Sequence, residues 1–141
     1  MIYVNIYYFQ ETLIIMLLIE LLERERKMSK RMELAKERLS SEDEIKYSWT
    51  GKLDGKDGYL MLSNKKLVFV HESGFLSKKY DVPLDLPYER VVKIEREGRN
   101  KLVLTEAEDR RYNFVVRDVS LSRVESSIRD LIEATKKPEA P

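Results

Sequence analysis

A β-hairpin over residues 58–72 constrains the fold of this chain more than any other feature. The sequence there, GYLMLSNKKLVFVHE, places two short apolar runs, 59–62 and 67–70, on either side of a polar turn. Both runs are too short for helices, and their side chains suit a pleated surface. Asn64 in the turn tolerates the positive φ that a tight turn often needs. The segment therefore predicts two antiparallel strands.

Further strands are expected on both sides of this hairpin. Alternating apolar residues predict them at 45–50, 78–84, 90–96, 101–105 and 111–116, and a polar loop at 51–58. Four aromatic residues stand at core-facing spacing: Tyr47, Trp49, Tyr59 and Phe114. Val92 and Ile94 are expected to face the same way. Pro83 and Pro87 indicate a turn or a sheet edge, because proline cannot donate to a ladder.

One amphipathic helix is predicted after the last strand. Its apolar residues follow a 3.6-residue repeat: Leu121, Val124, Ile128, Leu131 and Ile132. Ser122 and Glu125 fit a capping box, and Ser120 is an alternative cap. No helix separates the strands, so a parallel βαβ fold is excluded. The expected fold is mainly β (α+β): a seven-stranded antiparallel bent sheet or partly open barrel capped by this C-terminal helix.

The chain divides into three regions by composition. Residues 1–44 are predicted to form a long N-terminal helix, apolar up to residue 22 and then highly charged. Residues 45–137 hold the β domain and its closing helix, and residues 138–141 are expected to be a disordered tail. The apolar surface of the first helix is the candidate contact with a membrane or a second copy, and its residues are Leu13, Ile14, Leu17, Leu18, Leu21 and Leu22.

Four readings of this apolar segment stay open. It packs on its own domain or a second copy, lies in a membrane interface, spans a membrane, or lies outside the natural product. A carboxylate such as Glu11 costs about 2.5–3.5 kcal/mol inside a bilayer, which counts against a span. A basic cluster follows the segment, as on a cytoplasmic flank: Arg24, Arg26, Lys27, Lys30 and Arg31.

Composition excludes several functions. The chain has no cysteine and one histidine, so thiolate and multi-histidine metal sites are excluded and no cofactor or metal is expected. A formal charge of +1 does not favour a nucleic-acid partner. Charged residues make up 36% of the chain, a balance similar to that of proteins from hot-living organisms.

His71 stands beside Glu72, but no positioned nucleophile accompanies them, so an enzyme is not expected. Residues 42–44 look like a solvated acidic cluster.

A family resemblance emerges from the strand sequences. The segments are GYL at 58–60, LSNKKLVF at 62–69, VPL at 82–84 and VVKI at 91–94. This pattern resembles the GRAM and bacterial PH-like members of the PH-like superfamily over about ninety residues. The resemblance implies a non-enzymatic module that binds lipids or proteins, often at membranes. The loop that carries the basic phosphoinositide motif in many PH domains reads GKLDGKD here, at 51–57, and contains no arginine.

The candidate ligand or partner site combines basic and apolar residues near the hairpin: Lys65, Lys66, Phe75, Leu76, Lys78 and Lys79. If the lysines were neighbours, they would form a patch for anionic lipid or an acidic partner. A Phe-Leu pair beside cations suits insertion into a membrane or a partner's pocket, or else it folds back on the core. The sequence thus predicts a cytoplasmic module that acts at or near the membrane surface and can form a homo-oligomer. The alternative is a soluble protein–protein scaffold that self-associates through its N-terminal helix.

Overall fold

The computed structural model describes the backbone of residues 2–136 and the side chains of residues 9–27 and 30–136. The predicted tail at 138–141 lies outside the described residues. Two compact units are present, Met1–Glu33 and Leu34–Pro141. The elements are α1 (Ile2–Glu37), β1 (Ile45–Leu53), β2 (Lys56–Ser63), β3 (Lys66–Ser73), β4 (Lys79–Pro87), the 3-10 turn η1 (Tyr88–Arg90), β5 (Val91–Glu97), β6 (Lys101–Glu106), β7 (Arg110–Val116) and α2 (Leu121–Lys136).

The first unit is made by the long helix α1. The predicted long N-terminal helix is confirmed, but it runs for 36 residues and ends at Glu37, not at residue 44. Its large apolar side chains, from Phe9 to Leu22, are between 49% and 71% exposed. The last turn of α1, from Leu34, belongs to the second unit, where Ala35 is fully buried.

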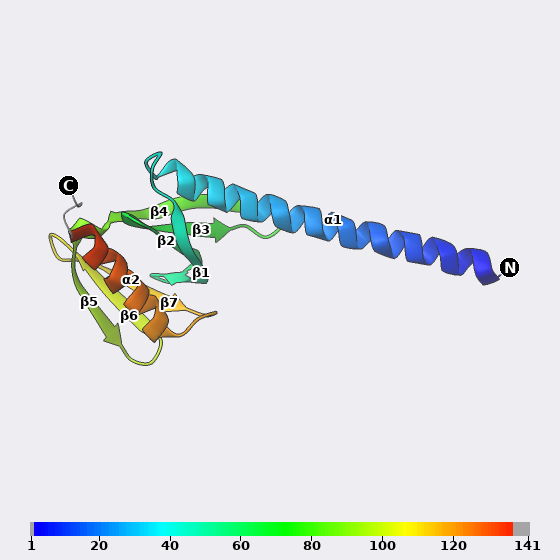
Figure 1. Ribbon diagram of the computed structural model, residues 1–141. Helices are drawn as coiled ribbons and strands as arrows, with labels where there is room; N and C mark the ends of the chain where they lie inside the picture. Colours follow the sequence, from blue (N-terminus) through cyan, green and yellow to red (C-terminus); the bar gives the residue numbers. More distant parts are fainter. Residues whose placement is uncertain (1, 137–141) are drawn as a thin grey trace. The chain divides into compact units, whose positions relative to one another are not determined.

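The second unit is a seven-stranded antiparallel sheet in the order β4-β3-β2-β1-β7-β6-β5. Strands β4 and β5 are consecutive in the chain, yet they form the two opposite edges of the sheet. The sheet therefore bends, and α2 packs inside the bend against η1 and β6 (Figure 1). The predicted fold class, seven strands closed by a C-terminal helix, is confirmed, and Pro83 and Pro87 do lie in an edge strand.

The core lies on the inner face of the sheet. Leu60 and Leu62 of β2 and Phe69 of β3 pack there with Val124 and Ile128 of α2. Side chains alternate between the faces of a strand. A second set on the outer face of β2 and β3 is also buried: Met61, Val68 and Val70. These two strands are therefore buried on both faces.

The predicted polar loop at 51–58 is wrong. Strands β1 and β2 continue through it and are joined by Asp54 and Gly55 alone, with Gly51 paired to Gly58. Asp54 has φ 48° and Gly55 has φ 85°. A two-residue hairpin turn of type I′ requires positive φ at both positions, which an Asp-Gly pair supplies at low cost. The Asp-Gly pair is visible in the sequence, and as a hairpin signal it outweighs the polar composition that suggested a loop.

The β2–β3 turn is held by side chains rather than by an unusual backbone. The expected positive φ at Asn64 is wrong, because Asn64 is not among the residues with positive φ. Asp43 accepts hydrogen bonds from the Ser63 hydroxyl at 2.7 Å and from the Asn64 N–H at 2.9 Å. The buried Tyr88 hydroxyl donates to the Ser63 carbonyl at 2.7 Å. Asp43 is therefore a structural residue and not part of a solvated cluster as predicted.

Three expected core positions are wrong. A β-bulge between Val91 and Lys93 rotates the start of β5, so Val92 is 62% exposed and does not share the inward face of Ile94. Tyr47 is 37% exposed and stacks on Trp49 with ring centroids 5.3 Å apart. Tyr59 alternates with the core residue Leu60 and therefore faces outward.

Helix α2 is fixed at both its start and its middle. Ser120, the alternative cap, accepts a hydrogen bond from the Arg123 N–H at 3.3 Å, so Ser122 and Glu125 do not form the predicted capping box. Glu125 instead pairs with Arg96 of β5 at 2.5 Å and with Arg129 at 3.2 Å. Burial alone raises the pKa of Glu125, but the hydrogen bonds and charges of both arginines outweigh it and hold the pKa below its usual value.

Candidate functional site

The two ends of the bent sheet differ in the connections they carry. Antiparallel pairing places the β1–β2 turn, the β3–β4 loop (residues 74–78) and the β6–β7 turn at one end, called here the open end. The β2–β3 turn lies at the other end, called here the closed end. Residues of that turn and of the last turns of α2 line one groove, so the helix covers this end.

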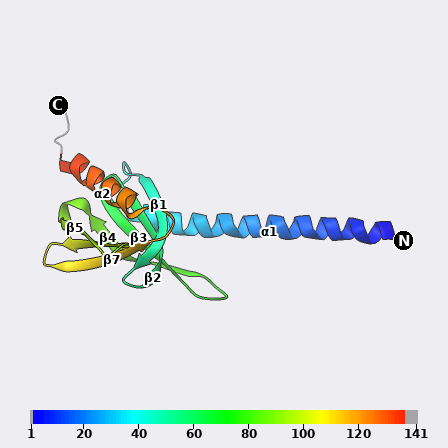
Figure 2. The same ribbon diagram turned by 90° about the horizontal axis from the view of Figure 1, so that it is seen from below.

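The β3–β4 loop presents two apolar side chains to solvent. Phe75 is 93% exposed and Leu76 is 95% exposed, so the loop does not fold back on the core. Figure 2 shows the β3–β4 hairpin projecting from the sheet. Gly74 has φ 96°, and a Cβ there would lie 2.1 Å from the Ser77 carbonyl oxygen, so the tight loop requires glycine. The backbone therefore holds Phe75 and Leu76 outward.

The structure separates the predicted lysines into two pairs. Lys78 and Lys79 adjoin the β3–β4 loop at the open end, whereas Lys65 and Lys66 lie at the closed end, at the other end of β3. Lys66 donates to the Arg38 carbonyl oxygen at 2.6 Å and pairs with Asp85 at 3.1 Å. The four lysines therefore make no single patch, and Lys66 has a structural role. Phe75, Leu76, Lys78 and Lys79 remain together in one loop.

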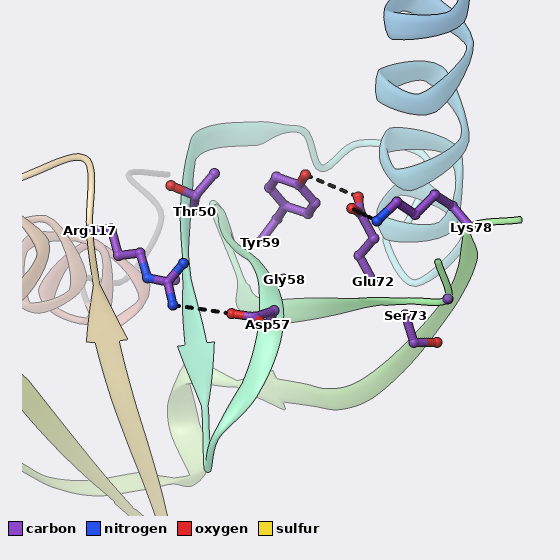
Figure 3. Close-up of a pocket in the computed structure, with 10 residues that line it drawn as sticks. Thr50, Asp57, Gly58, Tyr59, Glu72, Ser73, Lys78 and Arg117 are labelled. Atoms are coloured by element: carbon purple, nitrogen blue, oxygen red, sulfur yellow. Dashed lines mark hydrogen bonds and ion pairs between the residues drawn. The ribbon is translucent and has the colours of Figure 1, made fainter. Parts of the chain in front are cut away.

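A polar cleft of about 450 Å³ lies beside this loop (Figure 3). Its walls carry two ion pairs. Arg117 lies 3.3 Å from Asp57, and Lys78 lies 3.5 Å from Glu72. The Tyr59 hydroxyl donates to the second carboxylate oxygen of Glu72 at 3.1 Å. The cleft therefore offers cations close to the exposed apolar pair, each already neutralised by a carboxylate.

The adjacent residues His71 and Glu72, noted in the sequence, have different partners in the structure. His71 donates from Nδ1 to the Asp57 carbonyl oxygen at 2.7 Å, which ties it to the neighbouring strand. Within the described part of the chain, no group of three or more acidic or histidine side chains is placed to hold a metal ion.

The β1–β2 turn cannot supply a basic phosphate cradle. Asp54 accepts from both the backbone N–H and the side-chain amide of Asn113, at 3.1 Å and 2.9 Å. A two-residue turn leaves no room for several converging cations. Lys52 lies 3.9 Å from Asp57, on the cleft side of the turn.

Sequence reasoning missed most residues of the cleft. Thr50, Asp57, Tyr59 and Arg117 come from β1, β2 and the segment after β7, so their proximity depends on strand register. No local motif marks them. The register Gly51 to Val116 brings the segment after β7 beside β1, and this pairing was not readable from the sequence.

The apolar N-terminal helix carries the second set of candidate residues. Leu13, Ile14, Leu17, Leu18, Leu21 and Leu22 are all exposed within α1. Among the residues that the structure describes, no helix is both long enough and apolar enough to cross a membrane.

Comparison with known proteins gives the fold but no family. No protein-family model matches the chain, and no curated protein matches it. The N-terminal PH domain of Vps36 has a similar structure, with a TM-score of 0.53 and 9% identity over 69% of this chain and 84% of that domain. The C-terminal domain of an unknown protein from Leishmania infantum has a TM-score of 0.47 and 14% identity, over 68% of this chain and 88% of that one. The N-terminal PH domain of human ARAP2 has a TM-score of 0.43 and 16% identity, over 73% of this chain and 92% of that one. The fold is therefore PH-like, and the finer resemblance to GRAM domains stays a prediction.

Proposed function

We propose that this chain is a non-enzymatic PH-like binding module that docks on an anionic membrane surface. Docking occurs through the β3–β4 loop, with Phe75 and Leu76 in the apolar boundary of the membrane and Lys78 and Lys79 beside the headgroups. The protein then works as a peripheral component on the cytoplasmic side of a membrane.

One observation carries this proposal: the two most exposed large apolar side chains of the second unit are neighbours at the tip of a projecting hairpin. Isolated exposed apolar residues are common, but an adjacent pair held outward beside cations is a usual sign of an interaction site. Full burial of each side chain would contribute roughly 1.5–3 kcal/mol, and each lysine near an anionic surface about 1 kcal/mol.

The N-terminal helix offers a second membrane anchor. Its exposed apolar residues between Leu13 and Leu22 add hydrophobic area, and the basic residues that follow add attraction to anionic lipid. A single weak anchor binds membranes reversibly, and two together bind much more stably. The helix and the loop are thus proposed as two anchors of one protein.

The test is vesicle co-sedimentation of the full chain across a salt series, with anionic and neutral vesicles. Lys78→Glu combined with Lys79→Glu should lower binding to anionic vesicles and flatten its salt dependence. Arg99→Glu with Lys101→Glu, at the β5–β6 turn, gives the same change in net charge away from the loop and should bind like the wild type.

Equal binding of both double variants would reject the loop as a membrane contact. The loop would then be a protein-docking edge, and a scaffold that self-associates through its N-terminal helix would be the better account. Binding that is independent of lipid charge would place the attraction in the apolar helix alone.

A further inference from the structure

The two edges of the sheet are unequally protected. An edge strand exposes unpaired N–H and C=O groups, which is a liability that proline, bulges and charges usually limit. The edge strand β4 contains Pro83 and ends at Pro87, and its pairing with β3 is interrupted by a bulge. The edge strand β5, with the sequence VVKIERE, contains no proline, and its bulge lies at its start, between Val91 and Lys93, so the stretch from Lys93 to Glu97 pairs regularly. A groove of about 400 Å³ runs between this strand and α2.

The outward backbone of β5 can be assigned from its contacts. The Ala107 N–H donates to the Arg90 carbonyl oxygen at 2.9 Å, so Arg90 faces β6 and, with the residue added by the bulge before Lys93, Ile94 faces away from it. Arg129 of α2 donates to the Ile94 carbonyl oxygen at 3.0 Å, which agrees with this orientation. Backbone groups alternate along an antiparallel strand, so the N–H and C=O of Ile94 and Arg96 both face the free edge. A carbonyl oxygen accepts two hydrogen bonds, so Arg129 leaves one acceptor position on Ile94.

The side chains of β5 are complementary to those of a second β5 strand that runs antiparallel to it. Pairing about Ile94 sets Lys93 opposite Glu95 of the second strand, and Glu95 opposite Lys93 of that strand. Both residues are exposed, with their charged groups 3.2 Å apart within one chain. They occupy the positions between the hydrogen-bonded pairs, where facing side chains come closest. Edge charges usually repel another strand, but this order places opposite charges together.

We propose that two copies of this chain pair through their β5 strands, antiparallel and centred on Ile94, to form one continuous sheet. The pairing is isologous: each Lys93 meets the other copy's Glu95, and the Ile94 residues of the two copies exchange backbone hydrogen bonds. This surface uses no residue of α1 or of the β3–β4 loop, and the proposal does not depend on membrane binding.

Cysteine cross-linking of the full chain tests the register, because the protein has no cysteine of its own. In the proposed pair the two Ile94 Cα atoms lie about 5.5 Å apart, within disulfide range. Ile94→Cys should therefore give a covalent dimer on mild oxidation. Glu97→Cys on the same strand is the control, since its two copies would lie about 20 Å apart in the pair and should form no disulfide-linked dimer.

Charge reversal in the Ile94→Cys background tests the side-chain complementarity. Lys93→Glu should reduce the dimer yield at least several-fold, and Lys93→Glu combined with Glu95→Lys should restore it. The proposal is overturned if Ile94→Cys forms no more dimer than Glu97→Cys, or if the combined swap does not recover the yield. A chain that stays monomeric but protects the Arg96 amide from hydrogen exchange in cell extract would indicate an extended segment of another protein, and would also overturn it.

Discussion

The closed and open ends of the second unit are built on opposite principles. At the closed end, polar groups are bonded to one another: Asp43 holds the β2–β3 turn, and the Tyr88 hydroxyl reaches the Ser63 carbonyl. At the open end, Phe75 and Leu76 stand almost fully in solvent on a glycine-dependent loop. Hydrogen bonds at the closed end stabilise the unit itself. The apolar pair at the open end contributes little to the fold, which is why we assign it to binding.

The largest effect is expected where α2 closes the sheet. Ile128→Asp places an unpaired carboxylate at a fully buried position, which should lower the free energy of unfolding by several kcal/mol or prevent folding. Ser126→Asp, on the exposed face of the same helix, should change it by less than about 1 kcal/mol. Denaturant titration measures both, and an unchanged midpoint for Ile128→Asp would show that α2 does not dock as described.

The next effect concerns Asp43 at the closed end. Asp43→Ala removes the carboxylate that accepts from the Ser63 hydroxyl and leaves the Asn64 N–H without its acceptor, which should cost about 2 kcal/mol of unfolding free energy. Glu42→Ala, one residue away and exposed, should cost less than about 0.5 kcal/mol. If both variants unfold at the same denaturant concentration, Asp43 is solvated as the sequence suggested and the comparison of the two ends fails.

A pH dependence should follow from Glu125. The two arginines hold its pKa below the unfolded value, so its contribution is present above about pH 4.3 and is lost as pH falls through the folded pKa. Glu125→Gln should therefore cost about 1 kcal/mol at pH 7 and reduce the loss of stability on acidification. Thermal unfolding of both proteins between pH 7 and pH 3 measures this, and parallel curves would contradict the assignment.

The smallest effect on stability is expected at the loop. Phe75→Ser with Leu76→Ser should change the free energy of unfolding by less than about 0.5 kcal/mol, because both side chains are already in water. Anionic-vesicle binding of the same variant should weaken more than tenfold if the side chains are buried on docking. Val92→Ser, at another exposed apolar position, should change neither quantity. A destabilised loop variant would mean that Phe75 and Leu76 pack on the protein in solution.

The sequence predicted the fold well because its signals were periodic. Alternation along 59–62 and 67–70, and the 3.6-residue repeat through Val124 and Ile128, follow directly from which face each residue buries. Two errors fell where one residue changes the register, at the bulge after Val91 and at the Asp54–Gly55 turn. The apolar pair of the candidate site was visible as a motif, but its full exposure was not. Arg117 and Asp57 meet only through strand pairing across 60 residues, and no local pattern reports that.

Insertion of the β3–β4 loop into a membrane is the central claim, and fluorescence of Phe75→Trp in the full chain tests it most directly. Brominated lipids quench indoles that enter the acyl region, and the natural Trp49 is 9% exposed and common to all variants. With anionic vesicles, Phe75→Trp should shift to the blue and be quenched, whereas Val92→Trp on β5 should show neither change. A Phe75→Trp signal that matches Val92→Trp while the protein is vesicle-bound would show that the loop stays in water, and would contradict the claim.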